Sequence, residues 1–174
     1  YAGGKRNNPT YYEVCSGLTG HSEVVRVIWD KREIDVSDLL KMFWECHDPT
    51  QKNRQGNDMG TQYRSAIYYK NENNIKTILA SKEQYQTELS KKNLGLIETE
   101  IKMIDSYFYA EQYHQQYLAS AGSRQYCSAS PTKVKLGVFT GSNYKLEDHI
   151  WENFNWEVDK CVLRSDNNPI KNNI

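Results

Sequence analysis

Apolar residues recur along much of the chain with spacings typical of strands and helices in turn. After a loop-rich start at 1–21, strand patterns cover 22–29, 65–69 and 97–104, and helical patterns cover 37–47, 73–91 and 108–118. The first of these helices should be capped by Asp35 or Ser37 and cannot continue past Pro49. Because strands and helices alternate, the order predicts an α+β fold in which helices cover one side of a sheet.

A different composition begins near residue 120. The residues that follow are small and polar and include Cys127, which predicts a mobile connection. Further on, 134–139 fits a strand and 145–158 has the spacing of an amphipathic helix. We therefore divide the chain into a core, residues 1–120, and a mobile C-terminal tail, residues 121–174.

Length and charge limit the functions that the chain can have. Its 174 residues suffice for one domain with a single core. Lysine and arginine total 22 and aspartate and glutamate total 22, so no net field attracts nucleic acid or an anionic membrane. No apolar run approaches the roughly 20 residues of a membrane helix. The sequence thus predicts a soluble protein that binds neither nucleic acid nor membrane.

The segment 54–65, Arg-Gln-Gly-Asn-Asp-Met-Gly-Thr-Gln-Tyr-Arg-Ser, has neither a helical nor a strand period. Gly56 and Gly60 permit positive φ and close backbone approach, while side chains such as Asp58 and Tyr63 offer directional hydrogen bonds. This composition suits a pocket wall that binds a small polar group. The alternative is an ordinary tight turn ahead of the next strand.

Glu23 stands at the start of the strand pattern, on the same face as Val25, Val27 and Trp29. A carboxyl beside an apolar row is partly desolvated, and desolvation raises its pKa. Glu23 is therefore a candidate proton donor near neutral pH. The alternative is an exposed glutamate at the end of a strand.

Four cysteines, Cys15, Cys46, Cys127 and Cys161, lie far apart without a C-x-x-C pair, which disfavours a structural zinc site. A disulfide framework is unnecessary at this length, so reduced or redox-active thiols in a reducing compartment fit better. Cys15 and Cys46 could equally be buried small hydrophobic residues. Neighbours such as Cys46 and His47 cannot converge on one ion, so we expect no metal site and a structural His47.

Several motifs occur in order between Tyr1 and Leu118. They are Tyr1-Ala2-Gly3-Gly4, Pro9-Thr10-Tyr11, Val14-Cys15-Ser16-Gly17, Thr19-Gly20-His21, Glu23-Val24-Val25, Phe43-Trp44, His47-Asp48-Pro49-Thr50, the whole of 54–65, and Tyr113-His114-Gln115-Gln116-Tyr117-Leu118. Together they resemble the peptide methionine sulfoxide reductase A family. With the element order, this resemblance implies a two-layer α+β sandwich, a ferredoxin-like mixed sheet covered by helices, followed by an irregular C-terminal tail.

The resemblance implies an enzyme that reduces the S epimer of methionine sulfoxide, free or in peptides. A thiolate attacks the sulfur, an acid protonates the departing oxygen, and a second thiol converts the resulting sulfenic acid to a disulfide. Glu23 matches the family's acid, Tyr11, Asp58 and Tyr63 match its pocket groups, and Cys127 resembles its resolving cysteine. The family uses no metal or organic cofactor; thioredoxin reduces the disulfide, and dithiothreitol replaces it in vitro.

One part of the family's pattern is missing from this sequence. The nucleophile belongs to a Gly-Cys-Phe-Trp motif at the start of a helix, upstream of the loop that holds Tyr1, and no cysteine here matches it. We therefore expect the sequence to be truncated at its N-terminus, with the nucleophile and its strand and helix outside it. Their absence should leave a sheet face exposed.

Two functions follow from these observations. The first is the bulk of a thioredoxin-coupled reductase that repairs oxidised proteins. We expect it to act as a monomer in the cytoplasm or mitochondria, although a sequence that starts at Tyr1 does not show whether a targeting signal precedes it. The second is a non-catalytic relative that binds oxidised methionine or a protein partner, with the tail as its interaction element. An upstream Gly-Cys-Phe-Trp in the coding sequence favours the first, and a stop codon favours the second.

Overall fold

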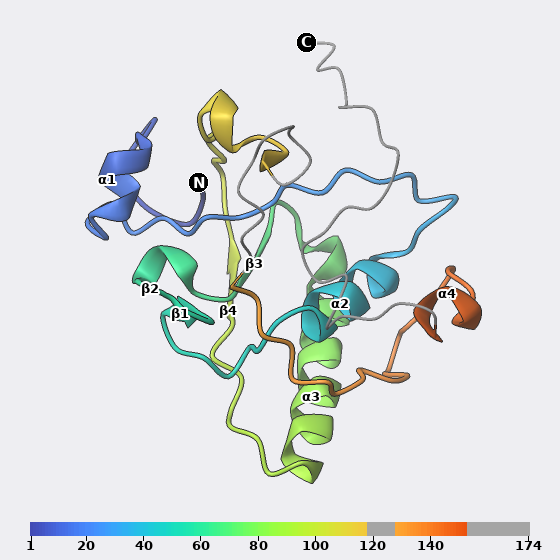
Figure 1. Cartoon of the computed structure of the whole chain (residues 1–174). Helices are drawn as coiled ribbons and strands as arrows, with labels where there is room; N and C mark the ends of the chain where they lie inside the picture. Colours follow the sequence, from blue (N-terminus) through green and yellow to red (C-terminus); the bar gives the residue numbers. More distant parts are fainter. Residues whose placement is uncertain (118–127, 153–174) are drawn as a thin grey trace.

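The computed structural model describes residues 1–117 and 128–152 (Figure 1). Its α-helices are α1 (Tyr11–Cys15), α2 (Val36–Glu45), α3 (Ile75–Lys91) and α4 (Asp148–Glu152), and its strands are β1 (Arg54–Gln55), β2 (Asp58–Met59), β3 (Ala66–Tyr69) and β4 (Glu100–Met103). Short 3-10 turns cover Thr61–Tyr63, Glu72–Asn74 and Gln112–His114. The long helix α3 and its neighbour α2 lie beside the β3–β4 pair, which confirms the α+β class.

The described strands form two small sheets. β3 and β4 are parallel, with Ile67 opposite Ile101, and α3 provides the crossover that a parallel pair requires. β1 and β2 form an antiparallel hairpin inside the segment 54–65. Strand directions are therefore mixed between the two sheets and not within either one.

Helix α2 begins as the sequence predicts. Asp35 is its cap: the Asp35 carboxylate accepts from the Ser37 backbone N–H at 2.9 Å. The Asp38 carboxylate accepts in return from the Asp35 N–H at 2.9 Å, which completes a capping box. Two otherwise unpaired donors of the first turn are thus satisfied by side chains.

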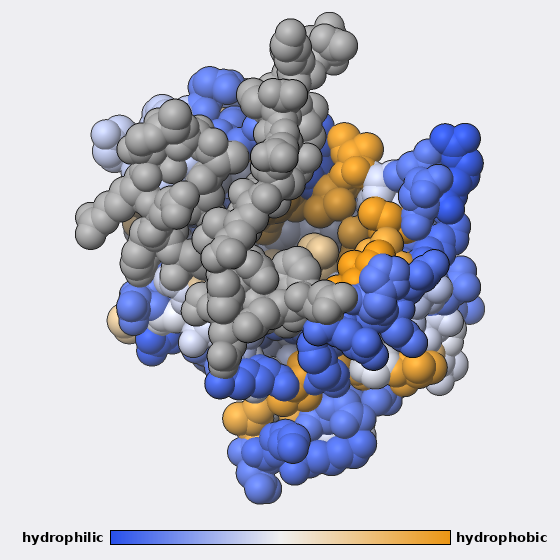
Figure 2. All heavy atoms as spheres, turned by 45° about the vertical axis from the view of Figure 1, so that its right-hand side comes forward, coloured by the Kyte–Doolittle hydropathy of each residue, from blue (hydrophilic) through white to orange (hydrophobic). Residues whose placement is uncertain are grey.

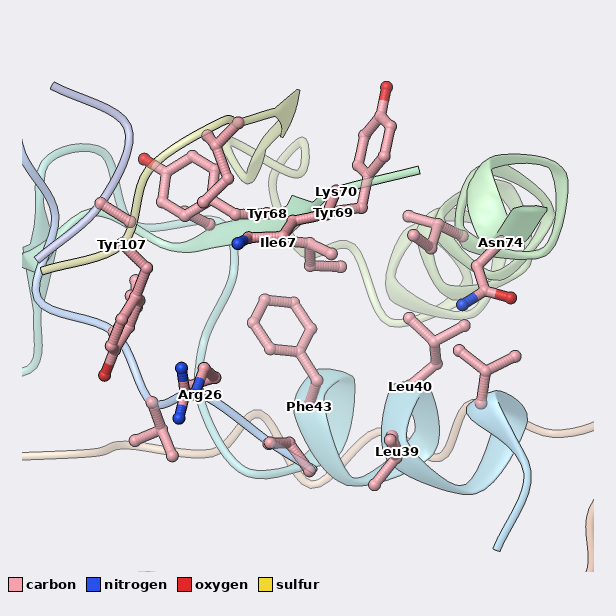
Figure 3. Close-up of a pocket in the computed structure, with 18 of the residues that line it drawn as sticks. Arg26, Leu39, Leu40, Phe43, Ile67, Tyr68, Tyr69, Lys70, Asn74 and Tyr107 are labelled. Carbon is pink, nitrogen blue, oxygen red and sulfur yellow. The ribbon is translucent and has the colours of Figure 1, made fainter. Parts of the chain in front are cut away.

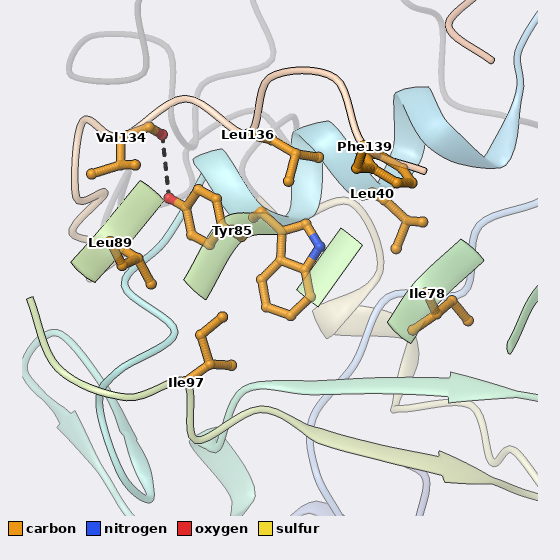
Figure 4. Close-up of a cluster of buried hydrophobic side chains, with 9 residues drawn as sticks. Leu40, Ile78, Tyr85, Leu89, Ile97, Val134, Leu136 and Phe139 are labelled. Carbon is orange, nitrogen blue, oxygen red and sulfur yellow. Dashed lines mark hydrogen bonds between the residues drawn. The ribbon is translucent and has the colours of Figure 1, made fainter. Parts of the chain in front are cut away.

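The hydrophobic core lies where α2 and α3 pack against the sheet (Figure 4). Trp44 is fully buried; its ring stacks on Tyr85 at 5.6 Å between centroids, and its indole N–H donates to Ser81 Oγ at 2.9 Å. The buried cluster consists of Leu40, Trp44, Ile78, Tyr85, Leu89, Ile97, Val134, Leu136 and Phe139. Val134, Leu136 and Phe139 come from the segment that the sequence analysis assigned to the C-terminal tail, so part of that segment packs into the core. The boundary between core and tail at residue 120 remains a prediction.

Buried polar groups also hold residues 132–146. Glu45 accepts from the Leu136 backbone N–H at 2.9 Å and from Lys41 Nζ at 2.8 Å, and Asp38 accepts from the Lys145 N–H at 3.1 Å. In the segment 134–139, Val134, Leu136 and Phe139 are buried, but the Leu136 N–H bonds to a side chain of helix α2 instead of a neighbouring strand. The expected strand is therefore absent here.

Two further predicted elements are wrong. The segment 22–29 forms no strand: Ser22 makes an isolated bridge with Ala2, and the Glu23 N–H donates to the carbonyl of Gln62, which belongs to a 3-10 turn and not to a strand ladder. The helix predicted at 108–118 is, as far as residue 117, only the turn Gln112–His114. Its first residues instead pair with the N-terminus, since the Phe108 N–H donates to the Tyr1 carbonyl at 2.9 Å.

Two other predicted elements are present but begin or end at different residues from those expected. The strand expected at 97–104 is confirmed over Glu100–Met103, and the helix expected at 73–91 over Ile75–Lys91. Of the helix expected at 145–158, the structure describes Asp148–Glu152, and positions 153–158 lie outside the described residues.

An apolar groove of about 600 Å³ runs between the extended segment 24–29, β3 and α2 (Figure 3). Phe43 and Ile67 point into it from α2 and β3. Hydrophobic residues reach the surface around a hollow on one face (Figure 2), and in this segment Val25 is 87% and Ile28 is 80% exposed. The groove therefore lies beside β3, and exposed apolar side chains of the segment 24–29 border it; the expected exposed sheet face remains a prediction.

The contribution of residues 132–146 to the core can be measured. Leu136→Ala removes a fully buried side chain, so we expect the free energy of unfolding to fall by about 2–4 kcal/mol in urea denaturation. Val138→Ala is the matched control: Val138 is 78% exposed, and the change should stay within about 0.5 kcal/mol. Equal effects of the two substitutions would show that the segment is not packed in the core.

Candidate active site

Helix α1 carries the first predicted pocket residue, Tyr11, and is fixed at its N-terminal end. Thr10 and Glu13 form a capping box at its start. The Tyr11 backbone N–H donates to Glu111 Oε1 at 2.8 Å, and Tyr1 donates its hydroxyl to the other Glu111 oxygen at 2.8 Å. Glu111 therefore ties α1 and the N-terminus to a segment a hundred residues further along the chain.

Glu23 is placed by backbone hydrogen bonds on two sides. The preceding residue, Ser22, pairs with Ala2 through bonds of 2.8 and 3.1 Å. The Glu23 N–H donates to the Gln62 carbonyl at 2.8 Å, in the 3-10 turn that also contains Tyr63. One backbone hydrogen bond thus connects Glu23, the predicted acid, to the turn that carries Tyr63, a predicted pocket phenol.

The electrostatics show that the four pocket residues share one environment. Burial raises the pKa of Glu23, and the Asp58 carboxylate adds to this shift. Burial and the Glu23 carboxylate raise the pKa of Tyr63. A hydrogen bond with Cys15, ahead of burial and of the Glu23 charge, raises the pKa of Tyr11 to about 12. Both phenols therefore keep their protons at neutral pH and can donate hydrogen bonds.

Cys15 lies in the same environment, although the sequence patterns assigned it no functional role. It ends α1, one turn after Tyr11, and is partly buried. It interacts with the hydroxyls of Tyr11 and Tyr63. The signal was present in the sequence: the Thr10-x-x-Glu13 pattern indicates a helix start, and on a helix Tyr11 and Cys15 share a face.

The segment 54–65 forms a tight turn, and one of its side chains acts on the candidate acid. β1 and β2 form its hairpin, and Gly56 adopts a φ of +56° at the turn. Asp58, on β2, raises the pKa of Glu23, and its carboxylate accepts a hydrogen bond from the Ser128 hydroxyl. The two interpretations offered by the sequence are therefore compatible.

His47 and Cys46 occupy interior positions away from these contacts. His47 bonds through Nδ1 to the Phe43 carbonyl at 2.7 Å and through Nε2 to Ser65 Oγ at 2.8 Å, and burial lowers its pKa, so it is a neutral structural residue. Burial raises the pKa of Cys46 to about 11, which keeps it an unreactive thiol. Cys127 and Cys161 lie outside the described residues.

The described ranges give two further findings. Within them, no group of three or more histidine, cysteine, aspartate or glutamate side chains is arranged to hold a metal ion. None of their helices has the length and apolar character needed to cross a bilayer.

A carboxyl whose pKa is raised, and whose charge in turn raises the pKa of two phenols, suits an enzyme that binds and protonates a departing oxygen. Comparison with known proteins agrees with that class. The family model described as peptide methionine sulfoxide reductase matches residues 1–144. The chain therefore belongs to the peptide methionine sulfoxide reductase family.

Named relatives and solved structures support this assignment. Peptide methionine sulfoxide reductase MsrA of Azotobacter vinelandii is 55% identical over 136 residues, which cover 78% of this chain and 62% of the relative. The mitochondrial peptide methionine sulfoxide reductase of Bos taurus is 54% identical over 140 residues, 79% of this chain and 60% of the relative. The chain thus spans about three fifths of the length of such relatives.

The fold is likewise shared with solved structures. Mxr1 of Saccharomyces cerevisiae, in reduced form, has a TM-score of 0.67 at 33% identity, covering 75% of this chain and 74% of that one. Methionine sulfoxide reductase A of Corynebacterium diphtheriae has a TM-score of 0.59 at 42% identity, covering 68% and 59%.

The raised pKa of Glu23 can be tested directly. A carboxyl that binds its proton more tightly in the folded state stabilises the fold less as the pH rises above the ordinary glutamate range. The Glu23→Gln protein should lack this loss. The unfolding free energy of the parent minus that of the variant should therefore decrease as the pH rises. A carboxyl titration of Glu23 by NMR that ends at or below the ordinary range would contradict this assignment.

Proposed function

We propose that this chain carries the acid and the pocket of a peptide-methionine (S)-S-oxide reductase. The observation that supports this most strongly is the grouping of Glu23, whose pKa is raised, with Tyr11, Tyr63 and Asp58. These residues come from three separate segments, and an ordinary strand end or turn does not require their association. Membership of the family supplies the reaction that fits them.

In the first half of the reaction, an attacking thiol takes the oxygen of the sulfoxide. The phenols of Tyr11 and Tyr63 donate hydrogen bonds to that oxygen, and Glu23 supplies a proton to it as the sulfur–oxygen bond breaks. Methionine leaves as the thioether and the thiol becomes a sulfenic acid, so the sulfoxide sulfur is reduced and the thiol sulfur is oxidised. The attacking thiol comes from the family's Gly-Cys-Phe-Trp segment, which this sequence does not contain.

In the second half, Cys127 acts as the resolving thiol. Its sulfur attacks the sulfenic sulfur, a disulfide forms, and the oxygen leaves as water. Thioredoxin, or dithiothreitol in vitro, then reduces the disulfide without a metal or organic cofactor. Substrates are oxidised proteins, peptides or free methionine sulfoxide, and a monomer in the reducing cytoplasm or mitochondrion is the state we propose. One relative is named as mitochondrial.

The decisive assay compares the two sulfoxide epimers. The 174-residue chain and the same chain extended by the family's N-terminal segment would be incubated with dithiothreitol and a peptide carrying each epimer. We expect only the extended protein to reduce the sulfoxide, and only the S epimer. Reduction by the shorter chain would identify one of its own cysteines as the nucleophile. Binding of oxidised peptide without reduction by either protein would favour the alternative, a non-catalytic binding protein.

Glu23→Gln in the extended protein should lower the rate of sulfoxide reduction by about 10²–10⁴, the range for loss of a general acid. Unfolding stability at neutral pH should not fall, because the variant loses only a partly desolvated charge. Glu33→Gln, at an exposed glutamate outside the site, is the matched control and should leave the rate unchanged. Parallel loss of rate and stability in Glu23→Gln would make Glu23 a structural residue.

A further inference from the structure

The carboxylate of Glu111 joins two segments that are far from it in the sequence. The Tyr11 backbone N–H donates to Glu111 Oε1 at 2.8 Å, and the Tyr1 hydroxyl donates to Glu111 Oε2 at 2.8 Å. Each carboxylate oxygen therefore has its own donor. Tyr1 is only 4% exposed, so one of these two bonds starts from a buried ring that is itself fixed in the fold.

Glu111 carries a negative charge at neutral pH. Its partial burial favours the neutral form, but the hydrogen bonds that it accepts, first among them that of the Tyr11 N–H, hold the pKa of Glu111 below the ordinary glutamate range. A hydrogen bond to an ionised carboxylate is stronger than one between neutral groups. The link between Glu111 and the main chain of Tyr11 is therefore a strong one.

The turn that Glu111 begins also contacts the ring of Tyr11. Glu111 directly precedes the 3-10 turn Gln112–His114, and its carbonyl accepts from the His114 N–H at 2.9 Å. The His114 ring packs against the Tyr11 ring with 4.7 Å between the ring centroids. Glu111 therefore acts on Tyr11 twice, directly on its main chain and, through this turn, on its ring.

The far end of the Tyr11 side chain reaches the candidate active site. Its hydroxyl forms a hydrogen bond with Cys15 and is influenced by Tyr63 and by the Glu23 carboxylate. Since the main chain and the ring of Tyr11 are both held from the side of Glu111, the position of this hydroxyl depends on Glu111. A displacement of about 1 Å at a group that binds a reacting atom can cost about 10² in rate.

We propose that Glu111 is a positioning residue for sulfoxide reduction: its carboxylate holds the start of α1, and with it the Tyr11 hydroxyl, in place to bind the sulfoxide oxygen. This role rests on the proposed function for the reaction and for the part that Tyr11 plays in it. Glu111 makes no contact with the reacting atoms in this role and acts only through Tyr11. Its effect on the rate must therefore disappear when the Tyr11 hydroxyl is removed.

The contact can be tested in the 174-residue chain without sulfoxide chemistry. Glu111→Ala removes both acceptor oxygens, so we expect hydrogen exchange of the Tyr11 N–H, followed by NMR, to become about tenfold faster or more. Glu111→Gln, which keeps one acceptor oxygen, should give a smaller increase. Glu83→Ala, at an exposed glutamate on α3, is the matched control and should leave this exchange rate unchanged.

Circular dichroism verifies that each variant is folded, and Glu111→Gln replaces Glu111→Ala if the latter is not. An exchange rate of the Tyr11 N–H that neither substitution of Glu111 changes overturns the proposal.

A double-mutant cycle separates positioning from general structural damage. In the extended protein of the epimer assay, Glu111→Ala and Tyr11→Phe should each lower kcat for the S epimer about tenfold or more. In the Tyr11→Phe protein, Glu111→Ala should change kcat by less than about twofold, because the hydroxyl that it positions is already absent.

A loss of rate that is as large in the Tyr11→Phe protein as in the parent would make Glu111 a structural residue and contradict the proposal. The absence of any loss in the parent would contradict it as well. Failure of the extended parent to reduce either epimer refutes the proposed function, and with it this role of Glu111, even where the exchange experiment confirms the contact.

Discussion

The arrangement of the site depends on the backbone pairing of one small residue, Ala2. This residue is completely buried and bridges Ser22 on one side and Tyr107 on the other. The first bridge fixes the segment that enters Glu23, and the second fixes the segment that leads to Glu111, which in turn holds Tyr11. Three distant parts of the sequence therefore meet through the main chain at Ala2.

A second level of organisation comes from the acids buried on α2. Asp38 and Glu45 would be costly to bury alone, but each accepts backbone N–H bonds from residues 132–146, and Glu45 also pairs with Lys41. The same segment supplies apolar side chains to the core. Residues 134–146 are therefore attached to the domain by both polar and apolar contacts.

Sequence patterns predicted the elements whose formation is local. α2 and α3 have helical periodicity and, in α2, a recognisable cap, and both appear close to their predicted bounds. The segment 22–29 has strand composition, yet a strand also needs a partner, and that depends on the rest of the fold. The same limit applied to the turn at 112–114, whose aromatic neighbours pair with the N-terminus instead of forming a helix.

The site residues likewise differ in how far the sequence could predict them. Desolvation beside an apolar row suggested Glu23, whereas the resemblance to the reductase family suggested Tyr11, and their roles remain predictions. Contacts that join distant segments, such as Cys15 with Tyr63 or Ser128 with Asp58, leave no periodic signal in the sequence.

The apolar groove beside β3 has a consequence for the behaviour of the protein in concentrated solution. Exposed apolar side chains such as Val25 and Ile28 beside this groove are the kind of surface through which proteins associate, so we expect self-association to increase with protein concentration.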